Sequence, residues 1–225
     1  MEDAGFCPRA KVSSELVVAD AIATAAKVNI TRVIFVLITT PSGCSKRWSC
    51  LNISIMQRPS ADEYHENYQK YFDLVPEGPY LELLGQNSKE TVRFFEAIPK
   101  EKLDYKYAPG KWTIKELLMH LIDTERVFSY RALVAARGDI TTPHYRMDEE
   151  LYAKNVDVTQ RTLQILLSEF QAVRGSTEKL FENLTDAQSK SPCNIVTHPM
   201  TARAIGYFII GHIHHHLKII EERYL

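Results

Sequence analysis

The chain has 225 residues, of which 45% are hydrophobic and 24% charged, and its formal net charge is -1. The near-neutral charge excludes a general electrostatic attraction to nucleic acid or to an anionic membrane, and we expect neither as a partner. With only 10 Pro and 9 Gly, the composition also argues against a low-complexity or all-β chain.

Residues 1–55 differ from the rest, because they hold three of the four cysteines and none of the eight histidines. Their apolar run at residues 33–38 is far shorter than the roughly 20 residues of a membrane span, and it lies too deep in the chain for a signal peptide. Gly43-Cys44 resembles a lipoprotein cleavage site, but Pro41 stands where a large aliphatic residue is expected. We therefore interpret residues 1–55 as a leader that is disordered, or as upstream sequence translated from a start codon assigned too early. Met56 looks like a natural beginning.

Residues 56–225 predict an all-α domain, a four-helix bundle with long loops after its second and third helices. An additional short helix is expected around residues 61–72. The single cysteine of this part, Cys193, gives no disulfide framework, which fits a reducing cytoplasm. The four amphipathic helices are expected at about residues 80–97, 113–137, 159–183 and 201–223.

Turn and capping residues mark the ends of these helices. Thr113 and Glu116 have the spacing of a capping box at the start of the second helix, and Gly138 is expected to end it. The third helix is expected to be started by Asp157 or Thr159.

The fourth helix contains the run GHIHHHL at residues 211–217. At about 100° per residue, His212 and His216 lie one turn apart on the apolar face, whereas His214 points to solvent and His215 lies at the flank. Two buried imidazoles need partners for their ring nitrogens, and a metal ion satisfies one nitrogen of each. Helical zinc proteases use the same spacing but place Glu after the first His, where this chain has Ile213. The protease interpretation is therefore excluded.

His120, on the second helix, is the candidate third ligand. Three histidines would leave a coordination position for water or substrate, as in catalytic zinc sites. The alternative is that the three are core histidines bonded to carboxylates such as Asp123 or Glu125. The other histidines outside this run, His65, His144 and His198, fall in predicted loops or near the N-terminus and are weaker candidates.

The chain resembles the DinB/YfiT-like family of four-helix metal proteins over residues 79–225. The segments that carry the resemblance are GKWTIKE at 110–116, LLMHLIDTER at 117–126, ARAIGY at 202–207 and GHIHHHL at 211–217. The resemblance implies an up-down-down-up bundle, zinc or nickel, a homodimer and a cytoplasmic location. The family's three metal-binding histidines correspond to His120, His212 and His216.

Members with known activity are often S-transferases that use bacillithiol, mycothiol or glutathione, and some are isomerases. The family name does not imply DNA binding.

Three functions remain open on this basis. The first is a metal-dependent S-transferase, in which the metal lowers the pKa of a low-molecular-weight thiol that attacks an electrophilic substrate. The second is hydrolysis by a metal-bound hydroxide, and the third is a non-catalytic module that binds metal or a small ligand.

Asp123 is a candidate second-shell catalytic residue that orients a ligand imidazole or moves a proton, whereas Glu125 is expected to be a solvated helix residue. Aromatic side chains at Trp112, Tyr145 and Tyr207 are candidates for either a substrate pocket or ordinary packing, and Cys193 is expected to be a spectator.

Overall fold

The computed structural model describes residues 33–37, 48–52 and 56–225, in two units, Met1–Ile53 and Ser54–Leu225. In the first unit, β1 (Val33–Leu37) pairs with β2 (Trp48–Asn52) in an antiparallel hairpin, with Val33 opposite Asn52. The other residues of the predicted leader lie outside the described residues, so its disorder stays a prediction.

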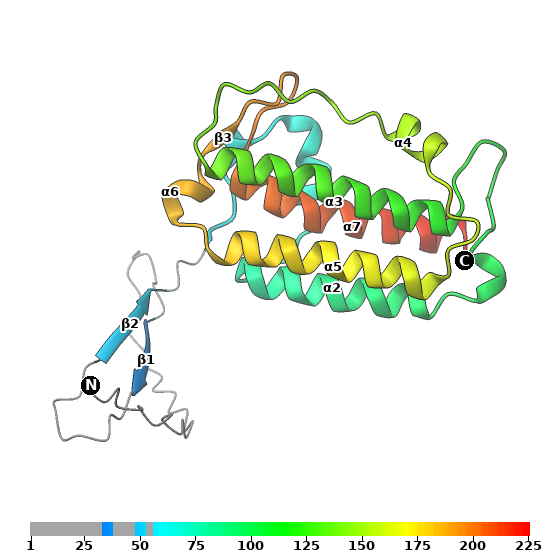
Figure 1. Ribbon diagram of the computed structural model, residues 1–225, viewed down its shortest axis with the longest axis horizontal. Helices are drawn as coiled ribbons and strands as arrows, with labels where there is room; N and C mark the ends of the chain where they lie inside the picture. Colours follow the sequence, from blue (N-terminus) through cyan, green and yellow to red (C-terminus); the bar gives the residue numbers. More distant parts are fainter. Residues whose placement is uncertain (1–32, 38–47, 53–55) are drawn as a thin grey trace, which may run out of the picture. The chain divides into compact units, whose positions relative to one another are not determined.

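The second unit is a four-helix bundle, as predicted (Figure 1). Its long helices are α2 (Tyr80–Glu96), α3 (Ile114–Ala136), α5 (Leu163–Glu182) and α7 (Ala202–Arg223). Both α2 and α3 pack against α5 and α7. Figure 1 shows α2 and α7 running in one direction and α3 and α5 in the other, which is the up-down-down-up arrangement.

Because α3 and α5 run parallel, the connection between them must return along the length of the bundle (Figure 1). This connection was expected to be a loop, but it contains the short helix α4 (Glu149–Asn155), which packs on α3. Asp148 caps α4 by accepting a hydrogen bond from the backbone N–H of Leu151 at 3.0 Å.

The predicted capping box of α3 is present. Thr113 Oγ1 accepts from the backbone N–H of Glu116 at 3.1 Å, and Glu116 Oε2 accepts from the N–H of Thr113 at 2.6 Å. The predicted start of α5 was wrong: the helix begins at Leu163, and Thr162 is its cap. Asp157 instead accepts two hydrogen bonds from Thr159, at 2.9 and 2.6 Å, and closes a turn before the helix.

The helix expected at residues 61–72 is present only in three short pieces: extended residues at Tyr64 and His65 separate the first from the second, and the second continues directly into the third. Two-residue strands form an antiparallel pair before α7, and no described helix is long and apolar enough to cross a membrane. The shorter elements are η1 (Ala61–Glu63), η2 (Glu66–Tyr68), α1 (Gln69–Phe72), η3 (Lys100–Lys102), α6 (Asp186–Ser189), β3 (Pro192–Cys193) and β4 (Met200–Thr201).

Polar side chains hold three of the long helices together inside the bundle. Arg174 of α5 donates two hydrogen bonds to the Glu125 carboxylate of α3, both at 2.8 Å. Its Nη1 donates to Asn87 Oδ1 at 2.9 Å and to the carbonyl of Leu84 at 3.1 Å, both on α2. Glu125 is therefore a buried structural residue, and the prediction that it is solvated was wrong.

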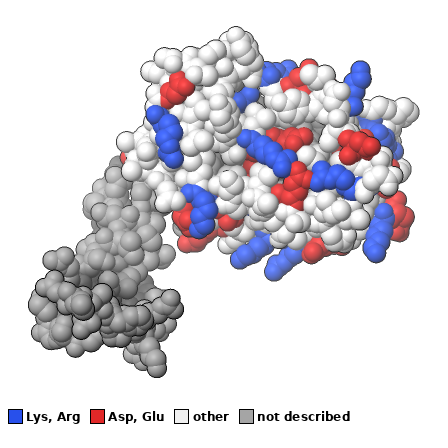
Figure 2. All heavy atoms as spheres, in the orientation of Figure 1, with Lys and Arg blue, Asp and Glu red and all other residues white. Residues whose placement is uncertain are grey.

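The apolar core has two clusters, one toward each end of the bundle. The first contains Phe72, Tyr80 and Phe208, and the second contains Phe95 and Leu118. On the outside, Figure 2 shows Lys and Arg side chains interspersed with Asp and Glu on the face in view.

Candidate metal centre

Three histidines converge at the contact between α3 and α7. Nε2 of His212 lies 3.2 Å from Nε2 of His120 and 3.1 Å from Nε2 of His216. His120 and His212 are buried, with 9% and 6% of their surface exposed. The antiparallel packing of the two helices therefore brings together the three residues that the sequence selected from positions about 90 residues apart.

The three Nε2 atoms cannot satisfy one another. A neutral imidazole nitrogen offers either one proton or one in-plane lone pair, so His212 Nε2 can complete a good hydrogen bond with only one of its two neighbours. Three nitrogens bound tetrahedrally to one ion at about 2.0–2.1 Å would stand roughly 3.3 Å apart. The observed separations, 3.1 and 3.2 Å, fit this donor set to a divalent metal ion.

Burial keeps the three rings neutral. It lowers the pKa of His120 to about 4, and Glu149 opposes this only in part. Burial also lowers the pKa of His212 and His216 well below the usual range, and the neighbouring histidines lower both further. Because the rings are unprotonated at neutral pH, their lone pairs are available without the cost of removing a proton.

Aromatic rings cover the histidines on two sides. The ring of Trp112 lies 4.9 Å from that of His120, and Tyr71 of α1 lies 5.8 Å from His212. Tyr71 can lie there because residue 211 is glycine: a Cβ at this position would stand 2.1 Å from the Tyr71 carbonyl oxygen. Sequence reasoning missed Tyr71, since no motif or short-range spacing relates it to His212.

His214 is placed differently from the prediction. It is half-buried, and its Nε2 lies 3.4 Å from the side-chain nitrogen of Asn87 on α2. The prediction of a solvent-facing side chain was wrong because α2 covers this flank of α7. His214 nevertheless lies outside the three-histidine cluster.

Asp123, the candidate second-shell residue, accepts a hydrogen bond at its Oδ1 from Arg126 Nη1 at 3.4 Å. Burial raises the pKa of Asp123, while Arg126 opposes the shift. Within the described part of the chain, no hydrogen bond joins Asp123 to the three histidines, so a role in orienting them stays a prediction.

Other candidates lie away from the centre. Tyr207 is buried in the core, Tyr145 is 73% exposed, and Cys193 is buried. Burial raises the pKa of the Cys193 thiol to about 11, which keeps it protonated at neutral pH. Among the remaining histidines, the rings of His65 and His198 contact each other, with centroids 4.4 Å apart. His144 is buried beside Tyr130, with ring centroids 5.6 Å apart.

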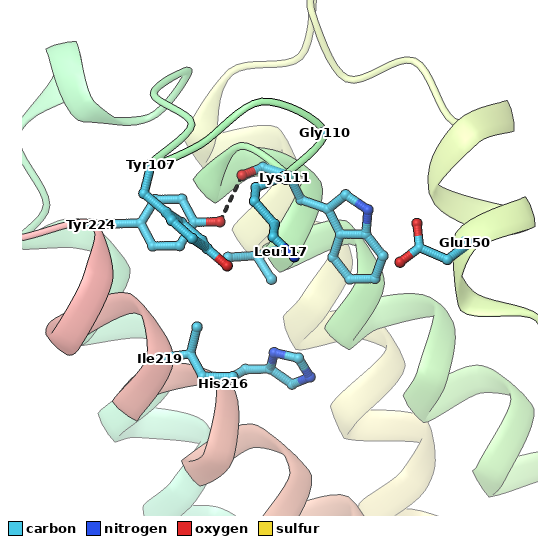
Figure 3. A pocket seen from close by; sticks show the side chains of 9 residues that line it. Tyr107, Gly110, Lys111, Leu117, Glu150, His216, Ile219 and Tyr224 are labelled. Carbon is cyan, nitrogen blue, oxygen red and sulfur yellow. Dashed lines mark hydrogen bonds between the residues drawn. The ribbon is translucent and has the colours of Figure 1, made fainter.

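A cavity of about 160 Å³ adjoins the centre at His216 (Figure 3). Trp112 and Tyr224 form part of its wall, and the Tyr224 hydroxyl donates to the carbonyl of Trp112 at 2.7 Å. This bond fixes the loop before α3 to the end of α7. Lys111 and Glu150 also line the cavity.

The family model of the DinB superfamily matches residues 83–220, which include all three histidines of the centre. The chain belongs to the DinB superfamily. YfiT of Bacillus subtilis, a protein proposed to be a metal-dependent hydrolase, is 25% identical over 149 residues, covering 64% of this chain and 81% of YfiT.

One solved structure agrees with the fold of this DinB-superfamily chain. The structure of Bacillus subtilis YfiT, described as an unusual four-helix bundle, superposes with a TM-score of 0.54 at 23% identity, covering 76% of this chain and 95% of YfiT. A DinB-like protein of Bacillus subtilis gives a TM-score of 0.45 at 20% identity, with coverage of 64% and 87%.

Proposed function

We propose that the chain is a metal-dependent enzyme that holds one divalent ion, zinc or nickel, with His120, His212 and His216. The convergence of three neutral Nε2 atoms on one point is the observation that carries this proposal. Membership in the DinB superfamily and the similarity to YfiT, itself proposed to be metal-dependent, also support it.

We further propose that the reaction is S-transfer. When bound, a divalent ion with three neutral ligands would supply a positive charge that favours the thiolate form of a low-molecular-weight thiol at neutral pH. The thiol would give its proton to water, and the thiolate sulfur would form a bond to an electrophilic carbon. A halide or an epoxide oxygen would leave with the bonding electron pair. A departing epoxide oxygen would then take a proton from water.

The residues around the centre favour this chemistry. Trp112 and Tyr71 cover His120 and His212 with aromatic rings, which limits the access of water to the imidazoles. The cavity beside His216 gives a small ligand room to approach. A homodimer in the cytoplasm, which the family resemblance implies, is part of the same proposal.

Hydrolysis is the second candidate, and the similarity to YfiT favours it. A water molecule would then replace the thiol as the nucleophile. A module that binds a small ligand without turnover is the remaining alternative.

A rate measurement separates the three functions. Bacillithiol, glutathione, coenzyme A and cysteine are each combined with an epoxide or an activated halide, in the presence of metal-loaded protein. We expect acceleration by the wild type and by His214→Ala, whose side chain lies outside the cluster, but not by His216→Ala. If no thiol reacts faster than background while an ester or amide is cleaved, the enzyme is a hydrolase. If neither reaction is accelerated, the non-catalytic function replaces both.

A further inference from the structure

His216, which lines the cavity, carries a buried polar atom without a hydrogen-bond partner. Nδ1 of His216 is shielded from solvent, and no group in the described part of the chain accepts or donates a hydrogen bond there. If Nε2 gives its lone pair to a metal ion, as the proposed function requires, the ring proton must be on Nδ1. Metal-bound histidines almost always donate this second N–H to a carboxylate, a carbonyl or water.

A cation lines the same cavity. The Lys111 side chain extends past the ring of Tyr224 toward Leu117, and the His216 ring lies below them in the view of Figure 3. Among the described residues, no carboxylate pairs with the Lys111 ammonium group. Lys106, on the same loop, is by contrast paired with Glu116 at 3.2 Å.

We propose that this cavity is a carboxylate-binding subsite, in which His216 Nδ1–H and the Lys111 ammonium group hold one carboxylate of a small organic acid. Both groups donate, and a carboxylate is the acceptor that satisfies a fixed donor and a cation at once. The rings of Trp112 and Tyr107 provide an apolar wall for the body of the acid. A volume of about 160 Å³ equals that of about five water molecules, which suits a molecule of a few carbon atoms.

The subsite deepens the proposed function and rests on it through His216. It predicts that a thiol or an electrophile carrying a carboxylate is preferred over its uncharged analogue. Glu150, which also lines the cavity, disfavours a second anionic group near its carboxylate (Figure 3).

Binding of propionate to the zinc-loaded protein tests the subsite without turnover. The chain has two tryptophans, so the indole N–H resonance of Trp112 can be assigned in a ¹H–¹⁵N spectrum by replacing Trp48 with Phe. We expect propionate to shift this resonance saturably, and propionamide, which has nearly the same shape and no charge, to bind at least about tenfold more weakly.

Two lysine variants locate the binding. Lys111→Met should weaken propionate binding about tenfold, the loss expected for one charge-assisted hydrogen bond. Lys106→Met, which removes the same charge outside the cavity, should bind propionate like the wild type. Equal affinities in Lys111→Met and wild type would place the carboxylate elsewhere, such as on the ion itself, and would overturn the proposal. Equal affinities for propionate and propionamide would also overturn it.

The outcome is separable from that of the transfer reaction. Propionate binding that depends on Lys111, in a protein that conjugates no thiol, would support the subsite and contradict S-transfer. Thiol conjugation with no preference for carboxylates would contradict the subsite alone.

Discussion

Glu125 and Arg174 form an ion pair from which water is almost completely excluded, with side chains 2% and 1% exposed. Removing one partner leaves the other charge buried and unpaired, which costs about 3–5 kcal/mol. We therefore expect Glu125→Ala to lower the free energy of unfolding by about this amount in urea denaturation. Glu182→Ala, which breaks an exposed pair with Lys179, should cost less than about 1 kcal/mol. Similar losses in the two variants would show that burial does not decide the strength of the pair.

Gly211 allows the backbone of α1 to lie against α7. In Gly211→Ala the new Cβ would stand 2.1 Å from the Tyr71 carbonyl oxygen, so α1 must move away from the centre. We expect a loss of about 1–3 kcal/mol in the free energy of unfolding, measured by chemical denaturation. Gly175→Ala is the matched control, because a Cβ on this residue of α5 meets nothing within 4 Å and should stabilise the helix by about 0.5–1 kcal/mol. A neutral effect of Gly211→Ala would contradict the close packing of α1 on α7.

At the level of elements, local signals in the sequence were sufficient to locate the four long helices, apart from the start of α5. The capping box at Thr113 and Glu116 depends on residues three apart, and the four-residue spacing of His212 and His216 fixes their common face. The start of α5 was misplaced because Asp157 and Thr162 are both good caps, and the choice depends on where the crossover meets the bundle.

Contacts between distant segments could not be predicted. Arg174 meets Glu125 across 49 positions, and His214 is covered by Asn87 across 127 positions. Neither pair has a sequence pattern that distinguishes it from solvated residues. His120 was found because its helix position and the family motif agreed, although no short-range spacing relates it to His212.

Glu63 joins η1 to the start of α7. Arg203 Nε donates to its carboxylate at 2.6 Å, and Thr201 Oγ1 donates at 2.9 Å. Burial alone would raise the pKa of Glu63, but hydrogen bonds from Arg203, Ser60 and Thr201 outweigh it and lower the pKa to about 2. The folded carboxylate therefore stays ionised between pH 4.5 and 2, while the unfolded chain takes up a proton.

This pair should contribute to stability above about pH 4.5, and the contribution should be lost as the pH falls toward 2. We expect Glu63→Gln to lower the free energy of unfolding by about 1–2 kcal/mol at pH 7, after allowance for screening by solvent. The difference from the wild type should shrink steadily in denaturation experiments below pH 4.5. A difference that is constant from pH 7 to 3 would mean that the carboxylate charge has no part in the contact.

At the scale of the whole molecule, the bundle of residues 56–225 has its own apolar core and its own polar network. The sequence of residues 1–55 lacks the amphipathic pattern of a segment that docks on such a bundle. We predict that deleting residues 1–55 leaves the metal content and the melting temperature nearly unchanged, as measured by elemental analysis and calorimetry. A drop of several degrees, or loss of solubility, would show instead that the leader packs on the bundle.

The metal content of purified histidine variants tests the central claim most directly. Elemental analysis should find about one divalent ion per chain in the wild type and in His214→Ala, because three histidines form one site and His214 lies outside it. His212→Ala and His216→Ala should lose the ion, and His120→Ala should lose it or bind it more weakly. Circular dichroism would confirm that each variant keeps its helices, since the bundle has an apolar core independent of the ion. Loss of the ion in His214→Ala together with full retention in His216→Ala would contradict the account.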